Sequence, residues 1–289
     1  MKKLTSVFGT AVLLLATLAG TGTAASAAAG SADTSKPQLL SPTPYMGWNT
    51  YFGLGGDFDE NTIKGVADSL VDRGLAAAGY DIVWLDGGWQ APTSRDADGD
   101  LVADPAKFPS GLQSLVTYIH SRGLKAGIYT DAGPWLPASC GLGSGGHYQH
   151  DGDQFAAWGF DAVKVDFLCG IAADLDPKTA FTAFAQALRS NASHRPMISN
   201  LCNPVTSPDW GDYPPSQQST NSWSYAPKIA QSWRTYTDVG FQHSIKFPDV
   251  LRNYDKNAAH PEVAGPGHWN DPDYLGPELG MSTEEFRTS

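Results

Sequence analysis

The hexapeptide AVKVDF, at residues 162–167, alternates apolar and charged side chains. A β-strand places successive side chains on opposite faces, so the two valines share one face while Lys164 and Asp166 share the other. The segment therefore predicts a strand that presents a lysine and an aspartate together at its carboxyl end.

Similar short apolar runs recur along the chain and alternate with stretches of helical periodicity. Gly74, Gly123 and Gly159 lie near the ends of three helical stretches, where glycine is a preferred cap. A regular alternation of strands and helices requires a parallel sheet. The predicted strands are 45–49, 81–85, 126–129, 162–165, 197–201, 233–237 and 268–273, and the predicted helices are 60–78, 111–122, 151–158, 179–190, a short one near 226–231, 247–258 and one that begins at 283.

Polar side chains mark the carboxyl ends of the predicted strands, and in a (β/α)₈ barrel these ends converge on one mouth. An open Rossmann sheet instead needs a G-x-G-x-x-G turn, which the sequence lacks, and the glycine-rich residues 53–56 are interpreted as a βα loop. We therefore predict the α/β class and a (β/α)₈ TIM barrel, truncated before its eighth strand. The polar residues at strand ends are Trp48, Asp86, Tyr129, Asp131, Asp166 and Asn203.

The first 27 residues have the pattern of a secretory signal peptide. Two lysines precede about a dozen apolar residues, too few to span a bilayer, and the sequence Ala-Ser-Ala at 25–27 fits a cleavage site. A membrane anchor is the alternative. Residues 28–40 are small and polar and are predicted to be a disordered lead-in. Residues 41–289 then form one catalytic domain, incomplete at its C-terminus, in a secreted protein that leaves the membrane after cleavage.

Composition and missing motifs exclude several function classes. The formal net charge of −11 argues against nucleic acid as a partner, because phosphates need a basic surface. A serine hydrolase would need a G-x-S-x-G elbow, which is absent. His147 and His150 lack a third ligand, and the aspartate-rich turn at 96–100 lacks the final glutamate of a calcium loop, so no metal is predicted.

Two pairs of charged residues carry the predicted chemistry. Lys164 is expected to keep Asp166 ionised, as a nucleophile at a sugar carbon must be. Arg234 and Asp238 share a face of the extended segment 233–238, at the end of which Asp238 could protonate a glycosidic oxygen. The alternatives are a structural ion pair for Asp166 and a helix N-cap for Asp238.

The chain contains three cysteines, Cys140, Cys169 and Cys202. Export permits a disulfide, and the odd number leaves at least one cysteine unpaired. No C-x-x-C motif or Cys/His cluster points to zinc.

Seven motifs together resemble glycoside hydrolase family 27, the α-galactosidase or melibiase family. The resemblance runs from Pro44 to the end of the chain and implies a secreted retaining α-galactosidase on a (β/α)₈ barrel, without a cofactor and with an oligo- or polysaccharide substrate. The motifs are PYMGWNTY at 44–51, YDIVWLDGGW at 80–89, RDADGDLVADPAKFPSGL at 95–112, GLKAGIYTDAG at 123–133, GFDAVKVDF at 159–167, WRTYTDVG at 233–240 and GPGHWNDPDYL at 265–275.

The resemblance also implies roles for individual residues. Asp166 matches the family's nucleophile and Asp238 its acid/base, while Cys140 and Cys169 match the disulfide at the mouth. The partner that Cys202 would have in the family is replaced by Ala230, which leaves this thiol free. An eighth strand and a C-terminal β-sandwich are expected beyond Ser289. The implied substrate-binding residues are Trp48, Asp86, Tyr129, Lys164, Asn203, Arg234 and Asp273.

Two departures from the family pattern leave the sugar open. Galactosidases of the family usually carry two successive acids where this chain has Asp86-Gly87, and many carry glutamate where it has Asn203. The alternative substrates are a β-L-arabinopyranoside, which lacks C6, and an α-1,6-glucan such as dextran. A further alternative is a non-catalytic carbohydrate-binding protein, against which the two intact charged pairs argue.

Overall fold

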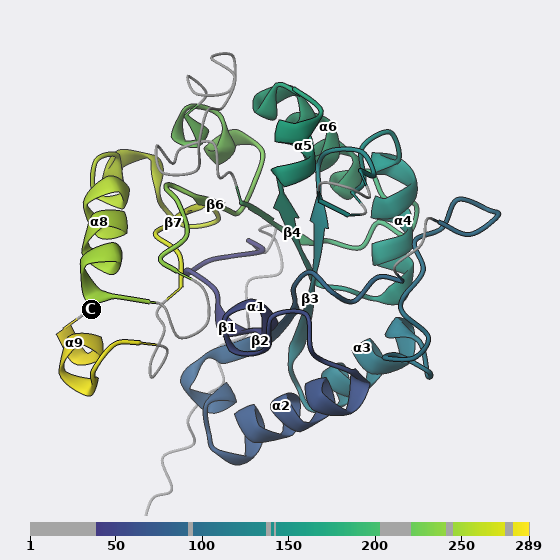
Figure 1. Cartoon of the computed structure of the whole chain (residues 1–289), viewed down its shortest axis with the longest axis horizontal. Helices are drawn as coiled ribbons and strands as arrows, with labels where there is room; N and C mark the ends of the chain where they lie inside the picture. Colours follow the sequence, from purple (N-terminus) through teal and green to yellow (C-terminus); the bar gives the residue numbers. More distant parts are fainter. Residues whose placement is uncertain are drawn as a thin grey trace, which may run out of the picture. The chain divides into compact units, whose positions relative to one another are not determined.

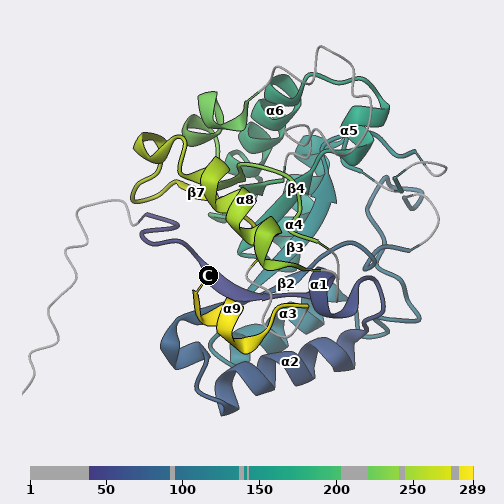
Figure 2. The same cartoon turned by 60° about the vertical axis from the view of Figure 1, so that its left-hand side comes forward.

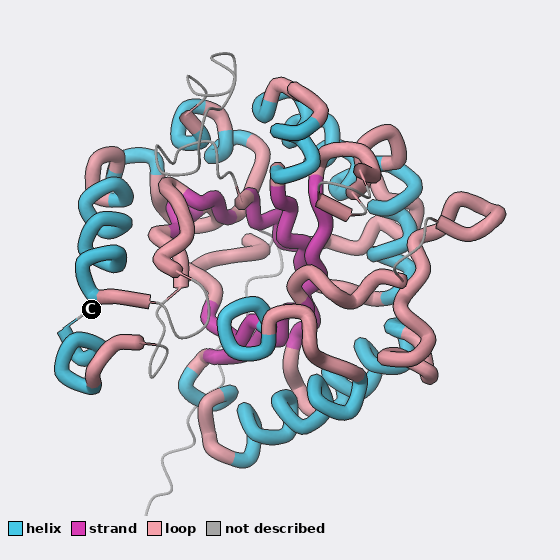
Figure 3. Tube along the Cα trace, in the orientation of Figure 1, coloured by secondary structure: helices cyan, strands magenta, loops and turns pink. Residues whose placement is uncertain are grey.

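A computed structural model of the chain places seven strands in one sheet, in chain order and all parallel. Residues 39–289 form one compact unit, within which the strands make a curved row with the longer helices outside it (Figure 1, Figure 3). The structure describes residues 39–91, 95–136, 140–141, 143–202, 221–240, 245–274 and 280–288. The strands are β1 (Met46–Asn49), β2 (Tyr80–Leu85), β3 (Lys125–Asp131), β4 (Ala162–Asp166), β5 (Ile198–Leu201), β6 (Ser232–Arg234) and β7 (Trp269–Asp271).

Helices follow most of these strands, as the alternation in the sequence predicts. In both cartoon views α2 and α3 lie together on the outer side of β2 and β3 (Figure 1, Figure 2). Two short helices, α1 and α5, were not predicted and directly follow β1 and the turn after β4. The helices are α1 (Thr50–Leu54), α2 (Glu60–Asp72), α3 (Leu112–Ser121), α4 (Tyr148–Trp158), α5 (Leu168–Ala172), α6 (Pro177–Arg189), α8 (Phe247–Asn257) and α9 (Thr283–Thr288).

Local capping fixes where several helices begin and end. Asp59 accepts a hydrogen bond from the backbone N–H of Thr62 at the start of α2, which satisfies a free helix donor. Gly74 has a φ of 76°, a left-handed conformation that ends the helix. The predicted helix 60–78 is therefore too long: α2 ends at Asp72, and residues Ala76–Ala78 form a separate 3₁₀ turn.

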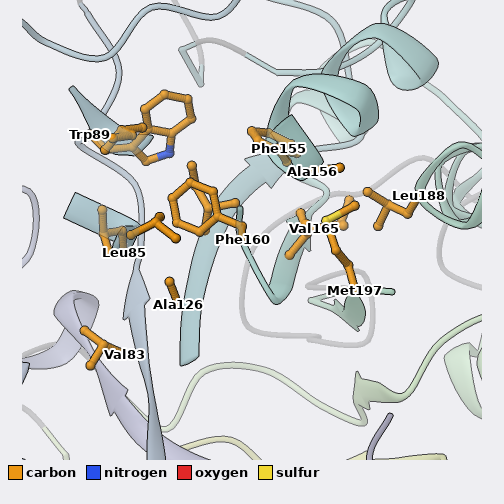
Figure 4. Packing of buried hydrophobic residues seen from close by; sticks show 14 of the residues in the cluster. Val83, Leu85, Trp89, Ala126, Phe155, Ala156, Phe160, Val165, Leu188 and Met197 are labelled. Carbon is orange, nitrogen blue, oxygen red and sulfur yellow. The ribbon is translucent and has the colours of Figure 1, made fainter. Parts of the chain in front are cut away.

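The strands separate two apolar layers because their side chains alternate. Outward-facing residues such as Val83 and Val165 pack against the helices in the largest hydrophobic cluster. Figure 4 shows this cluster, with Phe160 and Phe155 among the side chains that fill it. Inward-facing residues form a smaller cluster beneath the carboxyl ends of the strands; its buried members are Ile82, Trp84, Ala162 and Ile198.

Trp84 occupies the inside of the curved sheet because its neighbours leave room for an indole. A Cβ atom on Gly127 would lie 2.3 Å from the Trp84 ring, so only glycine fits beside it. Gly47 likewise leaves space for Ile82, because a Cβ atom added to Gly47 would lie 2.2 Å from the Ile82 carbonyl oxygen. The interior is thus filled below the strand ends, and any cavity must open above it.

Side-chain packing joins the two edges of the sheet at the carboxyl ends of the strands. Among the described residues no pairing connects β7 to β1. Phe52 of α1 instead stacks on Tyr274, with ring centroids 4.1 Å apart, in a cluster that also contains Val239 and Ile245. Seven parallel strands curled into part of a barrel confirm the predicted fold class.

Other element boundaries also differ from those predicted. β6 ends at Arg234 and not at 237, because the following residues turn towards the mouth. α4 begins at Tyr148, three residues earlier than predicted. Gly53 and Leu54, interpreted as loop, belong to α1. In the described part of the chain, no helix has the length and apolar character needed to cross a membrane.

Candidate active site

A cavity of about 190 Å³ opens at the carboxyl ends of the strands. This is the end at which (β/α)₈ barrels carry their functional residues. The volume is below the roughly 300–1,000 Å³ of pockets for drug-sized ligands, so the cavity has room only for a small group. Six of the predicted site residues line it together, namely Asp86, Tyr129, Lys164, Asp166, Arg234 and Asp238.

Asp166 lies at the end of β4 and is 9% exposed. Its carboxylate accepts hydrogen bonds from the Tyr129 hydroxyl, at 2.9 Å, and from the backbone N–H of Phe167, at 2.8 Å. Burial and then the negative charge of Asp131 raise the pKa of Asp166 to about 7, while Lys164 and the Phe167 N–H oppose the rise. Lys164 therefore lowers the pKa of Asp166, which is the predicted direction, but burial has the larger effect.

Lys164 shares the inner face of β4 with Asp166, as predicted, but its direct partner is Asp86. The ammonium nitrogen lies 2.7 Å from Asp86 Oδ2, which also accepts from the Asn49 side-chain amide at 3.2 Å. The same ammonium lies 5.4 Å from the centroid of the Tyr51 ring and 5.6 Å from that of Tyr129. A cation between two aromatic faces and a carboxylate forms one polar wall of the cavity.

Arg234 also lines the cavity, and it bridges two carboxylates. Its guanidinium lies 2.9 Å from Asp238 and 2.9 Å from Asp273. The Asp238 side chain is 21% exposed and lines the cavity, whereas the Asp273 side chain is 5% exposed and does not. Asp273 also accepts from the backbone N–H of Val239, at 2.8 Å. Asp273 was predicted to contact the substrate. The structure places it behind Arg234 instead, where its carboxylate holds the guanidinium in position.

Trp48 does not line the cavity, which corrects its predicted role as a sugar contact. Strand alternation turns its side chain to the outer face of β1, where it packs beside α2 in a separate groove. The aromatic residue that does line the cavity from this segment is Tyr51, in α1. Tyr51 could have been identified from the sequence, because it lies just past the end of β1 in the same PYMGWNTY motif.

Sulfur atoms lie close to the cavity. Cys140 and Cys169 form a disulfide, with Cα atoms 5.4 Å apart, which confirms the predicted pair. Cys202 is a buried free cysteine, as predicted, and lines the cavity with its sulfur 3.7 Å from an Arg234 nitrogen. Asn203, predicted to bind substrate, lies outside the described residues. In the described ranges the structure brings no three His, Cys, Asp or Glu residues together as a metal site.

Comparison with known proteins identifies the family. A family model described as alpha galactosidase A matches residues 55–289. The alpha-galactosidase A of Cellvibrio japonicus is 38% identical over 263 residues, which are 89% of this chain and 60% of that protein. The chain therefore spans about three fifths of the length of this relative.

Solved structures agree with this assignment. Alpha-galactosidase I from Mortierella vinacea superposes with a TM-score of 0.71 at 32% identity, covering 86% of this chain and 63% of that one. An α-galactosidase from Saccharomyces cerevisiae, solved with raffinose, gives a TM-score of 0.66 at 28% identity, over 82% and 53% of the two chains. The chain belongs to glycoside hydrolase family 27, the α-galactosidase family.

Proposed function

We propose that this protein is a retaining glycoside hydrolase that releases terminal α-linked galactose from oligosaccharides. The observation that carries the proposal is the presence of Asp166 and Asp238 on the walls of one small cavity, each with a different partner. The α-galactosidases to which the chain is similar, one of them solved with raffinose, support galactose as the sugar and an oligosaccharide as the substrate.

The proposed mechanism is a double displacement. Asp166 attacks the anomeric carbon and forms a C1–O bond as the glycosidic C1–O bond breaks, while Asp238 gives its proton to the departing oxygen. Asp238 then removes a proton from water, the water oxygen attacks C1, and the bond to Asp166 breaks. Asp238 is the more exposed of the two carboxyls, and so can reach both the leaving group and water.

Substitution of each carboxyl tests the two roles separately. Asp238→Asn should form the glycosyl-enzyme normally from an aryl galactoside with a good leaving group, then stall, which stopped-flow measurements record as a burst. Asp166→Asn should show no burst and lose nearly all turnover. A retaining mechanism also predicts that proton NMR of the wild-type reaction finds α-galactose as the first product. Near-normal turnover of an unactivated galactoside by either variant would overturn that residue's role.

A second sugar is favoured by the space beside Gly87. A Cβ atom at this position would lie 3.6 Å from the Tyr129 ring, an ordinary contact, so a side chain would fit where none is present. Of the two successive positions, only Asp86 therefore contributes a side chain to the cavity, which leaves room for a β-L-arabinopyranoside or an isomaltosyl unit. Parallel assays with chromogenic α-galactoside, β-L-arabinopyranoside and isomaltosyl substrates separate these activities, and binding without hydrolysis would identify a carbohydrate-binding protein.

Export is the remaining part of the proposal. Residues 1–27, which lie outside the described residues, carry the signal-peptide pattern, and the Cys140–Cys169 disulfide is of the kind that forms in oxidising compartments. N-terminal sequencing of protein from the culture medium should begin at residue 28. Retention of residues 1–27 on a membrane fraction would instead identify an anchor.

A further inference from the structure

Asp131 is a buried carboxylate beside the proposed nucleophile, and the mechanism above does not use it. It ends β3 and is the register partner of Asp166, which ends β4. Its exposed fraction is 2%, and it does not line the cavity. A carboxylate in such a place needs compensation, because burial strongly disfavours its charge.

The compensation comes from backbone N–H groups. Asp131 accepts hydrogen bonds from Gly133 at 2.6 Å, Cys169 at 3.0 Å and Gly170 at 3.2 Å. Within the described ranges, no lysine, arginine or histidine lies within ion-pair distance of it. The negative charge is therefore held in place but not neutralised by an opposite charge.

These hydrogen bonds connect two segments that flank the nucleophile. Gly133 follows β3, whereas Cys169 and Gly170 belong to α5, which begins two residues after Asp166. The backbone N–H of Ala132 donates in turn to the Asp166 carbonyl oxygen, at 2.9 Å. Asp131 thus fixes the turn from which the Asp166 side chain projects.

We propose that Asp131 is a positioning residue for Asp166: it anchors the turn after β4 and places a fixed negative charge beside the nucleophile. This inference rests on the proposed glycosidase function. Esterification of Asp166 by the sugar removes the charge of Asp166, and with it the repulsion from Asp131. The neighbouring charge therefore favours formation of the glycosyl-enzyme over the resting carboxylate.

The electrostatics of the pair support this role. After burial, Asp131 is the largest influence that raises the pKa of Asp166. Burial also raises the pKa of Asp131, against the lowering effect of its backbone donors. The groups that interact with Asp166 from the surrounding elements are Tyr51, Tyr129, Asp131, Lys164, Cys202 and Asp238, and Asp86 lies beyond Lys164 as its ion-pair partner.

The test compares Asp131→Asn with Asp131→Glu in the complete protein. In Asp131→Asn the charge is lost, so the acidic limb of kcat/KM against pH should move to lower pH by about one unit. Loss of one anchoring hydrogen bond should also lower kcat, by about tenfold to a hundredfold. Asp131→Glu keeps the charge and should leave the acidic limb in place even if kcat falls.

Asp151→Asn is the matched control. Asp151 is a buried carboxylate of α4, paired with Arg95 and absent from the cavity lining, so its loss should lower stability without moving the acidic limb. An unmoved limb in a folded Asp131→Asn protein would overturn the proposal, as would equal shifts in Asp131→Asn and Asp151→Asn.

A second measurement needs no enzymatic activity. Carbon-13 NMR of aspartate carboxyl groups, assigned with Asp166→Asn, should find Asp166 titrating well above the ordinary value of about 3.9. Titration at or below that value in the wild type would overturn the electrostatic role. If the wild type hydrolyses no glycoside but the pKa of Asp166 is high and falls in Asp131→Asn, the proposed function fails while the inferred interaction with Asp131 stands.

Discussion

Gly87 leaves part of the cavity wall beside the Tyr129 ring without a side chain. We expect Gly87→Asp to raise the ratio of kcat/KM for an α-galactoside over that for a β-L-arabinopyranoside by about tenfold. An added carboxylate could accept from the C6 hydroxyl of galactose, which arabinose lacks, and such a hydrogen bond contributes about 1–3 kcal/mol. Steady-state kinetics on both aryl glycosides measure the ratio.

Gly65→Asp is the control for the added charge. Gly65 lies on α2, and no atom is within 4 Å of where its Cβ would be. This variant should leave the ratio unchanged. If the ratio also stays constant in Gly87→Asp, position 87 does not contact the sugar, and the argument for an altered specificity fails.

The three cysteines make a prediction about free thiols. Thiol titration of the denatured, unreduced protein should find one thiol per chain, from Cys202, because Cys140 and Cys169 are joined. Native protein should react slowly, since Cys202 is buried. Cys202→Ser should give no free thiol, and a value of three in the wild type would contradict the disulfide.

Charged residues of the site could be predicted from the sequence better than aromatic ones. Lys164 and Asp166 follow from strand alternation alone, because both must face the same side. The same alternation, applied to Trp48, would have placed its side chain outside the sheet and redirected attention to Tyr51. The burial of Asp273 behind Arg234 could not be predicted, since it depends on a contact between two different strand ends.

At the scale of elements, α1 closes the cavity by packing on the segment after β7. Phe52 is 4% exposed, lines the cavity and stacks on Tyr274. We expect Phe52→Ala to lower the free energy of unfolding by about 3–5 kcal/mol. It should also raise KM, because the stack holds Tyr51 and the cavity wall in place. Denaturant unfolding and steady-state kinetics measure the two effects.

Phe184→Ala separates lost stability from lost cavity geometry. Phe184 is fully buried in α6, within the outer apolar cluster and away from the cavity. It should lose comparable stability but retain the wild-type KM. A wild-type KM in Phe52→Ala, or equal KM changes in both variants, would contradict a specific role for the stack.

Long amphipathic elements were predicted well, and short ones poorly. The α6 pattern of apolar residues and the glycine caps identify helices that bury one face against the sheet. α1 and α5 have five residues each, too few for a periodic pattern to appear. β6 has three residues, and its predicted extension to 237 failed because the chain bends at residues 236–237, before Asp238 at the cavity.

At the scale of the whole molecule, parallel order alone brings the site together. Each strand ends at the same edge, so residues separated by more than 150 positions, such as Asp86 and Asp238, line one cavity. This convergence could be predicted from the βα alternation. The excess of carboxylates over cations that it creates could not, because it depends on which side chains become buried.

That excess of buried carboxylates predicts how stability depends on pH. Burial raises the pKa of Asp166 and of Asp273 to about 7, above the value of about 3.9 expected in the unfolded chain. Between these values the folded protein binds more protons, so their contribution to stability is full below about pH 4 and is lost as the pH rises through 7. The Tm should therefore fall from pH 5 to pH 8. Asp166→Asn has no charge to bury at this position, so its Tm should rise relative to that of the wild type as the pH increases. Differential scanning calorimetry of the two proteins measures this difference in Tm, from which the effects of the remaining titratable groups largely cancel. A difference in Tm that stays constant from pH 5 to pH 8 would show that Asp166 ionises in the folded protein as easily as in the unfolded one.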